Sequence, residues 1–480
     1  MLILDTINDF LWSYIVIVLL VFCAIYFTIR ARFVQFRRLR DMVKTITEPA
    51  SPPSQQPSTS SANVTSNSLP LREGKGGSLS PFQAFAVALS SRVGTGNLAG
   101  VASAIFIGGA GAVFWMWVMA LFGSATAFVE STLAQLYKRK GEDSYYGGPA
   151  YYMQHGLHAR WMGILFAILI TVTFGLANQV VQSTTLCDSI ADTFSLSKAW
   201  VGVVVTAATL IIIFGGIQRI SRFASLVVPF MAIGFLLLSF VVMIMNLSQI
   251  PHVFKLIFDS AFGLDSVAGG AVGAAVMQGV KRGLFSNEAG EGSAPNAAAI
   301  AETSHPVKQG LLQAFGVFID TLVICSCTAF IILLSGKHDC GKDGILLTSE
   351  ALSVHIGSFG KYFISAAIFL FAYSTIIANY FYGETNIRFI TGKKWSVALF
   401  RLLTGGVVML GALVELQTAF SMVDIVMGLM TITNLVAIIL LSPKVFRLLN
   451  HYLEQRKQGK NPVFHRAEMP EIEDDIECWE

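Results

Sequence analysis

Two short runs of residues in this chain share a pattern that suits ligand binding in apolar surroundings. Residues 92–104 read RVGTGNLAGVASA and residues 282–294 read RGLFSNEAGEGSA, with Arg, Asn, Ala-Gly and Ser-Ala in the same register. Both runs interrupt apolar stretches with glycine and polar residues. Such interruptions expose backbone amides and carbonyls, which a bilayer tolerates only where they line a cavity or bind something. Paired interruptions in two halves of a membrane protein indicate a transporter's binding site.

The first interruption, Val93-Gly-Thr-Gly-Asn97, carries groups that suit a carboxylate. Each glycine lowers helix stability by about 1 kcal/mol relative to alanine, so the pair can free the backbone locally. The half-helix that begins at the break then presents unpaired N–H groups and its positive dipole end. A glycine-rich packing face between close helices is the alternative. Because the second half contains a matching break, we expect Gly94, Thr95, Gly96 and Asn97 to bind substrate.

The second interruption, Phe285-Ser-Asn-Glu-Ala-Gly290, adds polar and aromatic groups. Ser286 and Asn287 can hydrogen-bond an amino acid or line its path. Phe285 can form an apolar wall or a thin gate. We therefore expect all three side chains to line the same binding site as the first interruption.

Two carboxylates, Glu288 and Glu291, lie at or near membrane depth in the second interruption. Charge is costly there and is usually paired or functional. The obvious partners are Arg92, Lys281 and Arg282. The cluster either takes part in function or only fixes the two broken segments, and the pattern leaves both readings open.

Polar residues also lie inside two other apolar spans. Gln179, midway along 161–190, can bond a substrate or bridge to a neighbouring helix. Ser374 and Thr375 offer adjacent hydroxyl oxygens, the kind of ligand that Na⁺ takes, although hydroxyls in helices usually bond back to helix carbonyls. Asn379 is one turn further along the same face as Thr375.

Composition restricts the class of protein. The chain has 54% hydrophobic and only 13% charged residues, whereas a soluble domain usually carries about 25% charge. It is therefore a polytopic membrane protein, and its net charge of +3 gives no indication of nucleic-acid binding. The cysteines lack zinc or thioredoxin spacing, and no Walker, HExxH or GxSxG sequence is present. We expect no enzyme activity, no catalytic residue and no organic cofactor.

Apolar runs of about 20 residues, the length that spans a bilayer core, predict an all-α protein with about 11 transmembrane helices. Basic residues are concentrated in alternate loops, which places the N-terminus outside and the C-terminus in the cytoplasm by the positive-inside rule. The predicted spans lie near 11–30, 82–108, 111–137, 161–190, 199–217, 223–246, 266–299, 309–335, 360–388, 395–415 and 419–442.

The two interrupted spans run in opposite directions in this topology, which predicts two inverted repeats behind one extra N-terminal helix. A Pro-, Ser- and Thr-rich stretch then reads as a disordered linker. The predicted organisation is an N-terminal helix with a basic segment at 1–48, a cytoplasmic linker at 49–80, a first repeat at 81–246, a second repeat at 247–445 and a cytoplasmic tail at 446–480.

Three motifs resemble the alanine or glycine:cation symporter family, the sodium:alanine symporters. They are SSRVGTGNLAGVASAIFIGGAGAVFWMW, GGPAYYM at 147–153 and GLFSNEAGEGSAP. The resemblance covers the chain from about residue 80 to 445. It implies a leucine-transporter-type fold with a five-plus-five inverted repeat and an extra N-terminal helix.

The resemblance also implies which residues bind what. The first break would hold the substrate carboxylate at Gly94–Asn97, with contacts from Gln179 and from Phe285, Ser286 and their neighbours. The sodium site of this fold would use the carbonyls of Ser90 and Val93 with the hydroxyls of Ser374 and Thr375.

One position departs from the family pattern. Alanine-transporting members often have Trp where this chain has Asn379. The smaller amide leaves room for a longer side chain, such as that of glutamine.

These observations predict a sodium-coupled symporter that imports a small neutral amino acid (alanine, glycine, serine or glutamine) by alternating access. Na⁺ is the expected coupling ion, and the bacterial inner membrane is the expected location. The expected partners are the amino acid, Na⁺ and the lipid bilayer, with no nucleic acid or protein partner. The alternatives are a proton-coupled transporter with Glu288 or Glu130 in the relay, and a sensor or channel that binds without cycling.

Overall fold

The computed structural model describes residues 8, 10–48, 79–141, 144–263, 269–470, 472 and 475–479. Within these residues the fold is almost entirely helical, and each of the apolar ranges predicted from the sequence contains at least one helix. Eight of the described helices are long and apolar enough to cross a membrane, so the chain is an all-α, multi-pass membrane protein. The predicted linker at 49–80 lies outside the described residues except for Leu79 and Ser80.

The first half of the chain contains the first interrupted span. Its leading helix, α5, begins at a capping box in which Ser80 Oγ accepts from the N–H of Gln83 (3.2 Å) and Gln83 Oε1 accepts from the N–H of Ser80 (3.0 Å). The elements in order are η1 Leu11–Val16, α2 Ile17–Arg30, α3 Val34–Arg37, α4 Leu39–Ile46, α5 Pro81–Arg92, η2 Gly96–Gly100, α6 Val101–Gly108, α7 Gly111–Leu136, β1 Arg139–Lys140, β2 Tyr145–Tyr146, α8 Pro149–Gly156, α9 Arg160–Val172, η3 Thr173–Ala177, α10 Asn178–Phe194, α11 Lys198–Ile213 and α12 Gly216–Met245.

The second half contains the second interrupted span and two helices that hydropathy does not predict, α13 and α18. Helix α13 packs on α7 and α14, and α18 packs on α19. The elements are η4 Leu247–Gln249, α13 Ile250–Phe262, α14 Gly269–Asn287, α15 Ala294–Ala299, α16 Pro306–Val317, η5 Phe318–Cys325, α17 Ser326–Leu334, α18 Gly344–Ile356, α19 Phe359–Thr391, α20 Lys394–Gly411, α21 Leu416–Lys457 and η6 Arg466–Glu468.

Both predicted breaks are confirmed. Helix α5 ends at Arg92, and the chain resumes as the π-helical turn η2 before α6. Between α14 and α15 the backbone enters the left-handed region at Glu288 (φ 56°), Gly290 (φ 96°) and Gly292 (φ 83°). Two further π-helical turns, η3 and η5, interrupt spans that the sequence predicts to be regular.

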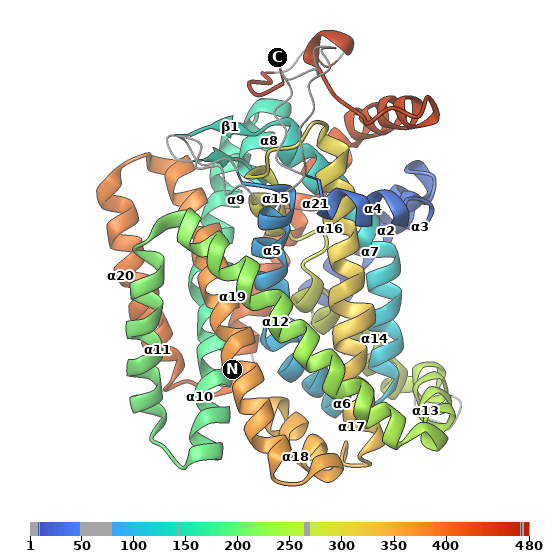
Figure 1. Ribbon diagram of the computed structural model, residues 1–480, viewed down its shortest axis with the longest axis vertical. Coiled ribbons are helices and arrows are strands. Elements are labelled where there is room, and N and C mark those ends of the chain that lie inside the picture. The colour runs from blue at the N-terminus through green and yellow to red at the C-terminus, as the bar shows by residue number, and fades with distance from the viewer. Residues whose placement is uncertain are drawn as a thin grey trace, which may run out of the picture.

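The broken helices lie inside the bundle, where they contact each other and several continuous helices. Helix α5 packs against α12, α15, α16 and α19, and α14 packs against α6 and α7 (Figure 1). Leu79, just before α5, pairs with Ala301, just after α15, and the N–H of Glu302 donates to the carbonyl of Leu79 (2.9 Å). The start of the first interrupted span is therefore hydrogen-bonded to the end of the second.

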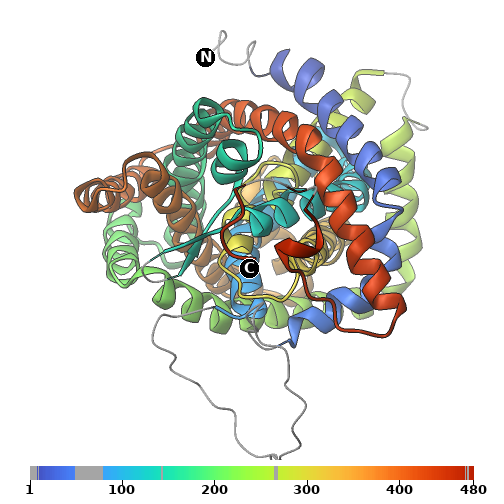
Figure 2. The ribbon, with the colours of Figure 1, turned by 90° about the horizontal axis from the view of Figure 1, so that it is seen from above.

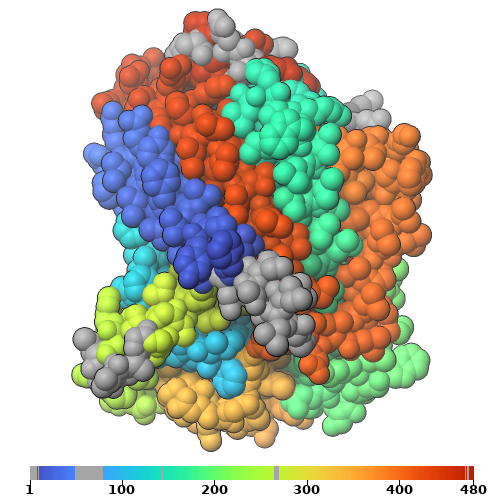
Figure 3. All heavy atoms as spheres, turned by 180° about the vertical axis from the view of Figure 1, so that it is seen from behind, coloured from blue at the N-terminus to red at the C-terminus, as the bar shows by residue number. Residues whose placement is uncertain are grey.

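Other helices lie at the periphery. Helix α2 covers the outside of the bundle against α7 and α21, as the space-filling view from behind shows (Figure 3). Helices α11 and α20 pack together at the opposite edge of the bundle (Figures 1 and 2).

The C-terminal segment, where the sequence predicts a cytoplasmic tail at 446–480, packs against the end of the bundle. Helix α21 continues to Lys457, and the described residues beyond it fold back over the end of the bundle near α8 and β1 (Figure 1). Trp479 is fully buried, and its Nε1 donates to the carbonyl of Gln135 (2.9 Å). The N–H of Phe464 donates to the carbonyl of Ser304 (2.9 Å). The described residues of this segment, 458–470, 472 and 475–479, are called the C-terminal cap below.

Candidate functional site

The backbone of the first break is hydrogen-bonded by side-chain amides. The N–H of Gly94 donates to Oδ1 of Asn97 (2.9 Å), and the N–H of Thr95 donates to Oε1 of Gln182 (3.1 Å). The N–H groups predicted to be unpaired therefore have neutral acceptors. A carboxylate accepts such bonds more strongly than an amide oxygen does, so a substrate carboxylate can replace either acceptor. Gln182, on α10, therefore lies at the first break, a position that the sequence did not indicate.

Asn97 connects the first break to a buried aspartate on η5. Its Nδ2 donates to Oδ1 of Asp320 (2.7 Å) and lies 3.3 Å from Sγ of Cys325. The other carboxylate oxygen of Asp320 accepts from the hydroxyls of Ser286 (2.8 Å) and Thr321 (2.9 Å). All of these donors are neutral, and the described residues form no ion pair with Asp320. The sequence showed Asp320 only as one of several acidic residues in spans, because nothing local marks its partners.

The second break lies directly against the first. A Cβ atom at Gly96 would lie 3.1 Å from Cα of Ser286 and 3.2 Å from the ring of Phe285, which is tighter than ordinary packing. Asn287 turns away from this contact, since its Nδ2 donates to Thr321 (3.2 Å) and its Oδ1 accepts from the N–H of Ala289 (3.0 Å). The structure thus places Phe285 and Ser286 against the first break, while the side chain of Asn287 hydrogen-bonds within the second break and to η5.

Part of the predicted sodium set is assembled between α5 and α19. The hydroxyl of Thr375 lies 2.8 Å from the carbonyl oxygen of Ser90 and 3.3 Å from that of Ser91. A Cβ atom at Gly94 would overlap this hydroxyl, so only glycine leaves room for it. Both hydroxyls also reach the carbonyl of Phe371 within α19, at 2.9 Å from Ser374 and 3.0 Å from Thr375, but the described contacts of Ser374 include no carbonyl of α5. Val93 is fully buried at the end of α5.

Asn379 contacts both breaks through one hydroxyl. Its Oδ1 lies 2.8 Å from Oγ of Ser91, which also hydrogen-bonds Oε1 of Glu288. The second oxygen of Glu288 accepts from Ser293 (2.6 Å). The Nδ2 of Asn379 is buried and has no hydrogen-bond partner among the described residues. A polar group is therefore left unsatisfied beside the breaks.

Gln179 has one of the two roles that the sequence left open, the bridge to a neighbouring helix. Its Nε2 donates to the carbonyl of Ile376 (3.0 Å), so it bridges α10 and α19. Its Oε1 is buried without a partner in the part of the chain that the structure describes. The oxygen is thus available to accept from a substrate ammonium group.

The expected pairing of Arg282 with the glutamates of the second break is wrong. Arg282 Nη2 forms an ion pair with Asp424 of α21 (2.8 Å), and the guanidinium lies 4.1 Å from the ring centroid of Phe420. The ring of Phe420 also packs edge-on against Phe285 (5.4 Å between centroids). The sequence could not show this partner, because α21 reaches α14 only through packing of distant segments.

Glu130 of α7 holds the second break in its left-handed conformation. Its two oxygens accept from the N–H groups of Gly290 and Gly292 (3.1 Å each) and from Nδ2 of Asn434 (2.8 Å). Two charged groups nearby are less satisfied. Both carboxylate oxygens of Glu291, and Nε and Nη2 of Arg92, lack hydrogen-bond partners among the described residues. These atoms can form further hydrogen bonds, to water, to an ion or to protein groups that approach in another conformation.

The chain was compared with known proteins. The sequence profile of the sodium:alanine symporter family matches residues 1–466. A Bacillus subtilis protein named probable sodium/glutamine symporter GlnT is 48% identical over 473 residues, covering 98% of this chain and 94% of the relative. The B. subtilis amino-acid carrier protein AlsT is 45% identical over 473 residues, covering 98% and 96%. A sodium/proton-dependent alanine carrier protein of Bacillus sp. PS3 is 38% identical over 407 residues, covering 81% and 91%.

Proposed function

This chain belongs to the sodium:alanine symporter family and is an amino-acid:cation symporter rather than an enzyme, and we propose that it imports a small neutral amino acid driven by Na⁺. The breaks of the two interrupted spans form the substrate site, and alternating access exposes this site to either side of the membrane. A sensor or channel that does not cycle is a poor match for a family of symporters.

One observation carries the sodium assignment. Thr375 Oγ1 lies within 3.3 Å of the carbonyl oxygens of Ser90 and Ser91, on a separate helix. A small displacement of α19 from α5 would let these oxygens share a cation instead of a proton. Hard cations take hydroxyl and carbonyl oxygens as ligands. Gly94 is the residue that makes this approach possible.

The substrate would bind with its carboxylate at Gly94 and Thr95, in place of the amide oxygens of Asn97 and Gln182. Its ammonium group would approach Oε1 of Gln179. The side chain would then lie toward Asn379, whose unpaired Nδ2 favours a substrate with an acceptor of its own. The name of the 48%-identical relative includes glutamine, which supports a polar side chain.

A second candidate, coupling to protons as well as Na⁺, is favoured by Asp320. This buried carboxylate touches both breaks through Asn97 and Ser286 and receives only neutral donors. A buried carboxylate without a cation is costly unless it binds a proton or a cation. Two of the relatives are named as sodium/proton-dependent alanine carriers, one of them putatively.

Uptake into proteoliposomes tests the proposal. Labelled alanine or glutamine should accumulate when Na⁺ is outside, and replacing Na⁺ with choline should abolish accumulation. A proton gradient imposed without Na⁺ tests the second candidate. If uptake is equal in choline and Na⁺ buffers, the sodium proposal is wrong.

A further inference from the structure

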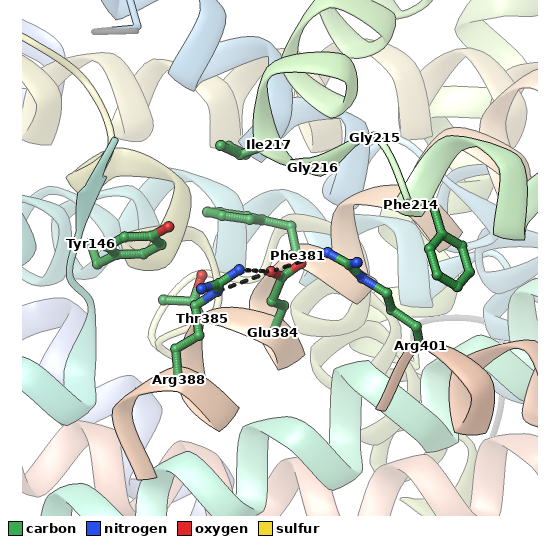
Figure 4. A pocket seen from close by; sticks show the side chains of 10 residues that line it. All are labelled: Tyr146, Phe214, Gly215, Gly216, Ile217, Phe381, Glu384, Thr385, Arg388 and Arg401. Atoms are coloured by element: carbon green, nitrogen blue, oxygen red, sulfur yellow. Dashed lines mark hydrogen bonds and ion pairs between the residues drawn. The ribbon is translucent and has the colours of Figure 1, made fainter. Parts of the chain in front are cut away.

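A cavity of about 180 Å³ lies away from the helix breaks, between the start of α12 and the facing parts of α19 and α20. Its lining includes Gly215, Gly216, Glu384, Thr385, Arg388 and Arg401. Figure 4 shows the two arginines directed toward one glutamate, with the glycine turn above them. The neighbouring basic residues predict that this end of the bundle faces the cytoplasm.

The cavity carries a net positive charge. Arg388 bonds Oε1 of Glu384 through Nη2 (2.6 Å) and Nε (3.0 Å), and Nη2 of Arg401 lies 3.7 Å from the same oxygen. Arg401 Nε also donates to the hydroxyl of Tyr380 (2.9 Å). One carboxylate therefore faces two guanidinium groups, which leaves one positive charge uncompensated in the lining.

The backbone adds further donors. Helix α12 is 30 residues long, and its N-cap is Gly215, which has no side chain to accept from the first N–H groups. Gly216 has a left-handed conformation (φ 70°), and a Cβ atom there would meet nothing within 4 Å. The side chain of Arg219 packs over Gly215, with its Nη1 donating to the carbonyl of Ile211 (2.8 Å), whereas the space at Gly216 is open. The positive end of a long helix and three arginines therefore lie together, an arrangement that favours an anion.

An unsatisfied hydroxyl also lines the cavity. Thr385 is 1% exposed, and its Oγ1 has no hydrogen-bond partner among the described residues. Most hydroxyls in helices bond back to a carbonyl one turn earlier, as Thr404 of α20 does. Thr385 therefore retains a donor at a wall that also carries the arginines and the helix end.

We propose that this cavity, called the α12–α20 pocket below, binds a phosphate group. Guanidinium forks, helix N-terminal amides and a hydroxyl are the groups that recognise phosphate oxygens. The source is either the headgroup of an anionic phospholipid in the adjoining leaflet or free phosphate. Exposed Phe214 at the rim, which is 55% exposed, suits contact with lipid chains. This site is separate from the helix breaks and does not depend on the identity of the coupling ion.

The test measures binding to the purified full-length protein in neutral detergent. The midpoint of thermal unfolding is followed by tryptophan fluorescence while one probe is added at a time, because a ligand that binds only the folded state raises the midpoint. The probes are phosphatidylglycerol, a glucosyl diacylglycerol that lacks phosphate, and inorganic phosphate. We expect phosphatidylglycerol to raise the midpoint in a saturable manner and the glucosyl lipid to have no comparable effect.

Variants separate the pocket from general charge. Arg401→Gln should raise the phosphatidylglycerol concentration needed for half the shift by about tenfold, as expected for the loss of one charged hydrogen bond. Arg222→Gln removes an exposed arginine of α12 that does not line the pocket, and it should change nothing. Thr385→Val keeps the shape of the side chain and should weaken binding by a smaller factor, which covers the case in which Arg401→Gln does not fold.

Each outcome is decisive. If inorganic phosphate alone gives the shift and Arg401→Gln removes it, the site exists and takes free phosphate. If only phosphatidylglycerol gives the shift, the source is the lipid headgroup. If the glucosyl lipid stabilises equally, or if Arg222→Gln and Arg401→Gln weaken binding alike while Thr385→Val has no effect, the pocket is not a phosphate site.

Discussion

The hydroxyl of Ser91, next to the end of α5, lies 2.8 Å from Oδ1 of Asn379 in α19. The same hydroxyl bonds Glu288 of the second break. A hydroxyl has only one hydrogen, so it donates to one of these two oxygens at a time. The hydroxyl proton of Ser91 is therefore shared between Asn379 of α19 and Glu288 of the second break. A substitution of Asn379 should for this reason change the hydrogen bonding of Glu288.

Asn379→Trp should shift substrate preference toward alanine and glycine. The indole is larger than the amide and removes the unpaired Nδ2, so a polar substrate side chain loses both room and a partner. An unpaired buried amide costs about 1–3 kcal/mol, which corresponds to roughly 5- to 150-fold in relative affinity. Competition by unlabelled glutamine against labelled alanine measures the shift. If glutamine fails to compete in the unaltered protein, the polar pocket is not a glutamine site.

Thr375→Ala should raise the Na⁺ concentration needed for half-maximal uptake by about tenfold, because one of a few oxygen ligands is lost. Ser374→Ala is the matched control, since both hydroxyls bond the carbonyl of Phe371 but only Thr375 also contacts the α5 carbonyls of Ser90 and Ser91 among the described residues. The activation curve for Na⁺ is measured in proteoliposomes at fixed amino acid. Equal effects of the two substitutions would show that Ser374 is also a ligand, and no effect of either would refute the site.

Gly96→Leu should abolish substrate binding while leaving expression and membrane insertion largely intact. Even a Cβ atom there would be 3.1 Å from Cα of Ser286, so a larger side chain pushes the two breaks apart. Gly234→Ala is the control for a glycine replaced in a helix, because a Cβ atom at that position meets nothing within 4 Å. Binding is measured by ligand-induced thermal stabilisation. Normal transport by Gly96→Leu would mean that the breaks do not form the site.

Asp320→Asn should reduce uptake about tenfold or more and abolish any dependence of uptake on a proton gradient. The substitution keeps the size of the side chain but removes the group that can carry a proton or face a cation. Cys325→Ser is the local control, because it contacts the same Asn97 and Ser286 without a carboxylate. Uptake is compared with and without an inward proton gradient at constant Na⁺. A proton-driven component that survives in Asp320→Asn excludes this residue as the carrier.

The C-terminal cap should be released when its carboxylate anchor is neutralised. Asp475 bonds Arg139 (2.7 Å) and His155 (2.8 Å), and the hydrogen bond from Arg139 lowers the pKa of this carboxyl below its ordinary value. Because this pKa is lowered, the contact stabilises the docked cap at pH values above the ordinary pKa of 3.8. That stabilisation is lost as the pH falls through the lowered pKa. The cap should therefore stay docked at neutral pH in the unaltered protein, and Asp475→Asn should loosen it there.

Labelling of Cys478 with a maleimide measures this release. The Cys478 thiol is buried in the docked cap, and burial raises its pKa to about 11. The limited access and the low fraction of thiolate both slow the reaction with maleimide. A Cys340→Ser background removes the exposed cysteine found among the described residues. Asp475→Asn and Trp479→Ala should each speed labelling several-fold, whereas Asp339→Asn, on an exposed loop, should not. An unchanged rate in both cap variants would mean that these contacts do not hold the cap.

Apolar runs were sufficient to predict where the helices lie, because about 20 consecutive apolar residues have few other uses. Glycine and polar residues at matching positions predicted both breaks. Helices α13 and α18 were not predicted, because each has 13 residues and is shorter than the run of about 20 that spans a bilayer. The two inverted repeats remain a prediction, as do the membrane orientation and the domain limits.

Site residues could be predicted only where the residue itself is unusual for its stretch of sequence. Thr375 and Asn379 stand out because polar residues are rare inside apolar spans. Gln182 and Asp320 enter the candidate site only through contacts with Thr95 and Asn97, which depend on how distant helices pack. For the same reason the partner of Arg282 proved to be Asp424, on a helix that no spacing rule connects to the second break.

The contact between Gly94 and Thr375 limits how this protein can change over evolutionary time. A mutation from glycine to alanine at 94 collides with the hydroxyl at 375, so it is accessible only after that hydroxyl has gone. A lineage that loses the hydroxyl first gives up an oxygen of the proposed cation site, and a later alanine at 94 blocks the route back. Among descendants of one ancestor, these two positions should therefore vary together, and the order of the two substitutions should be the same in every branch.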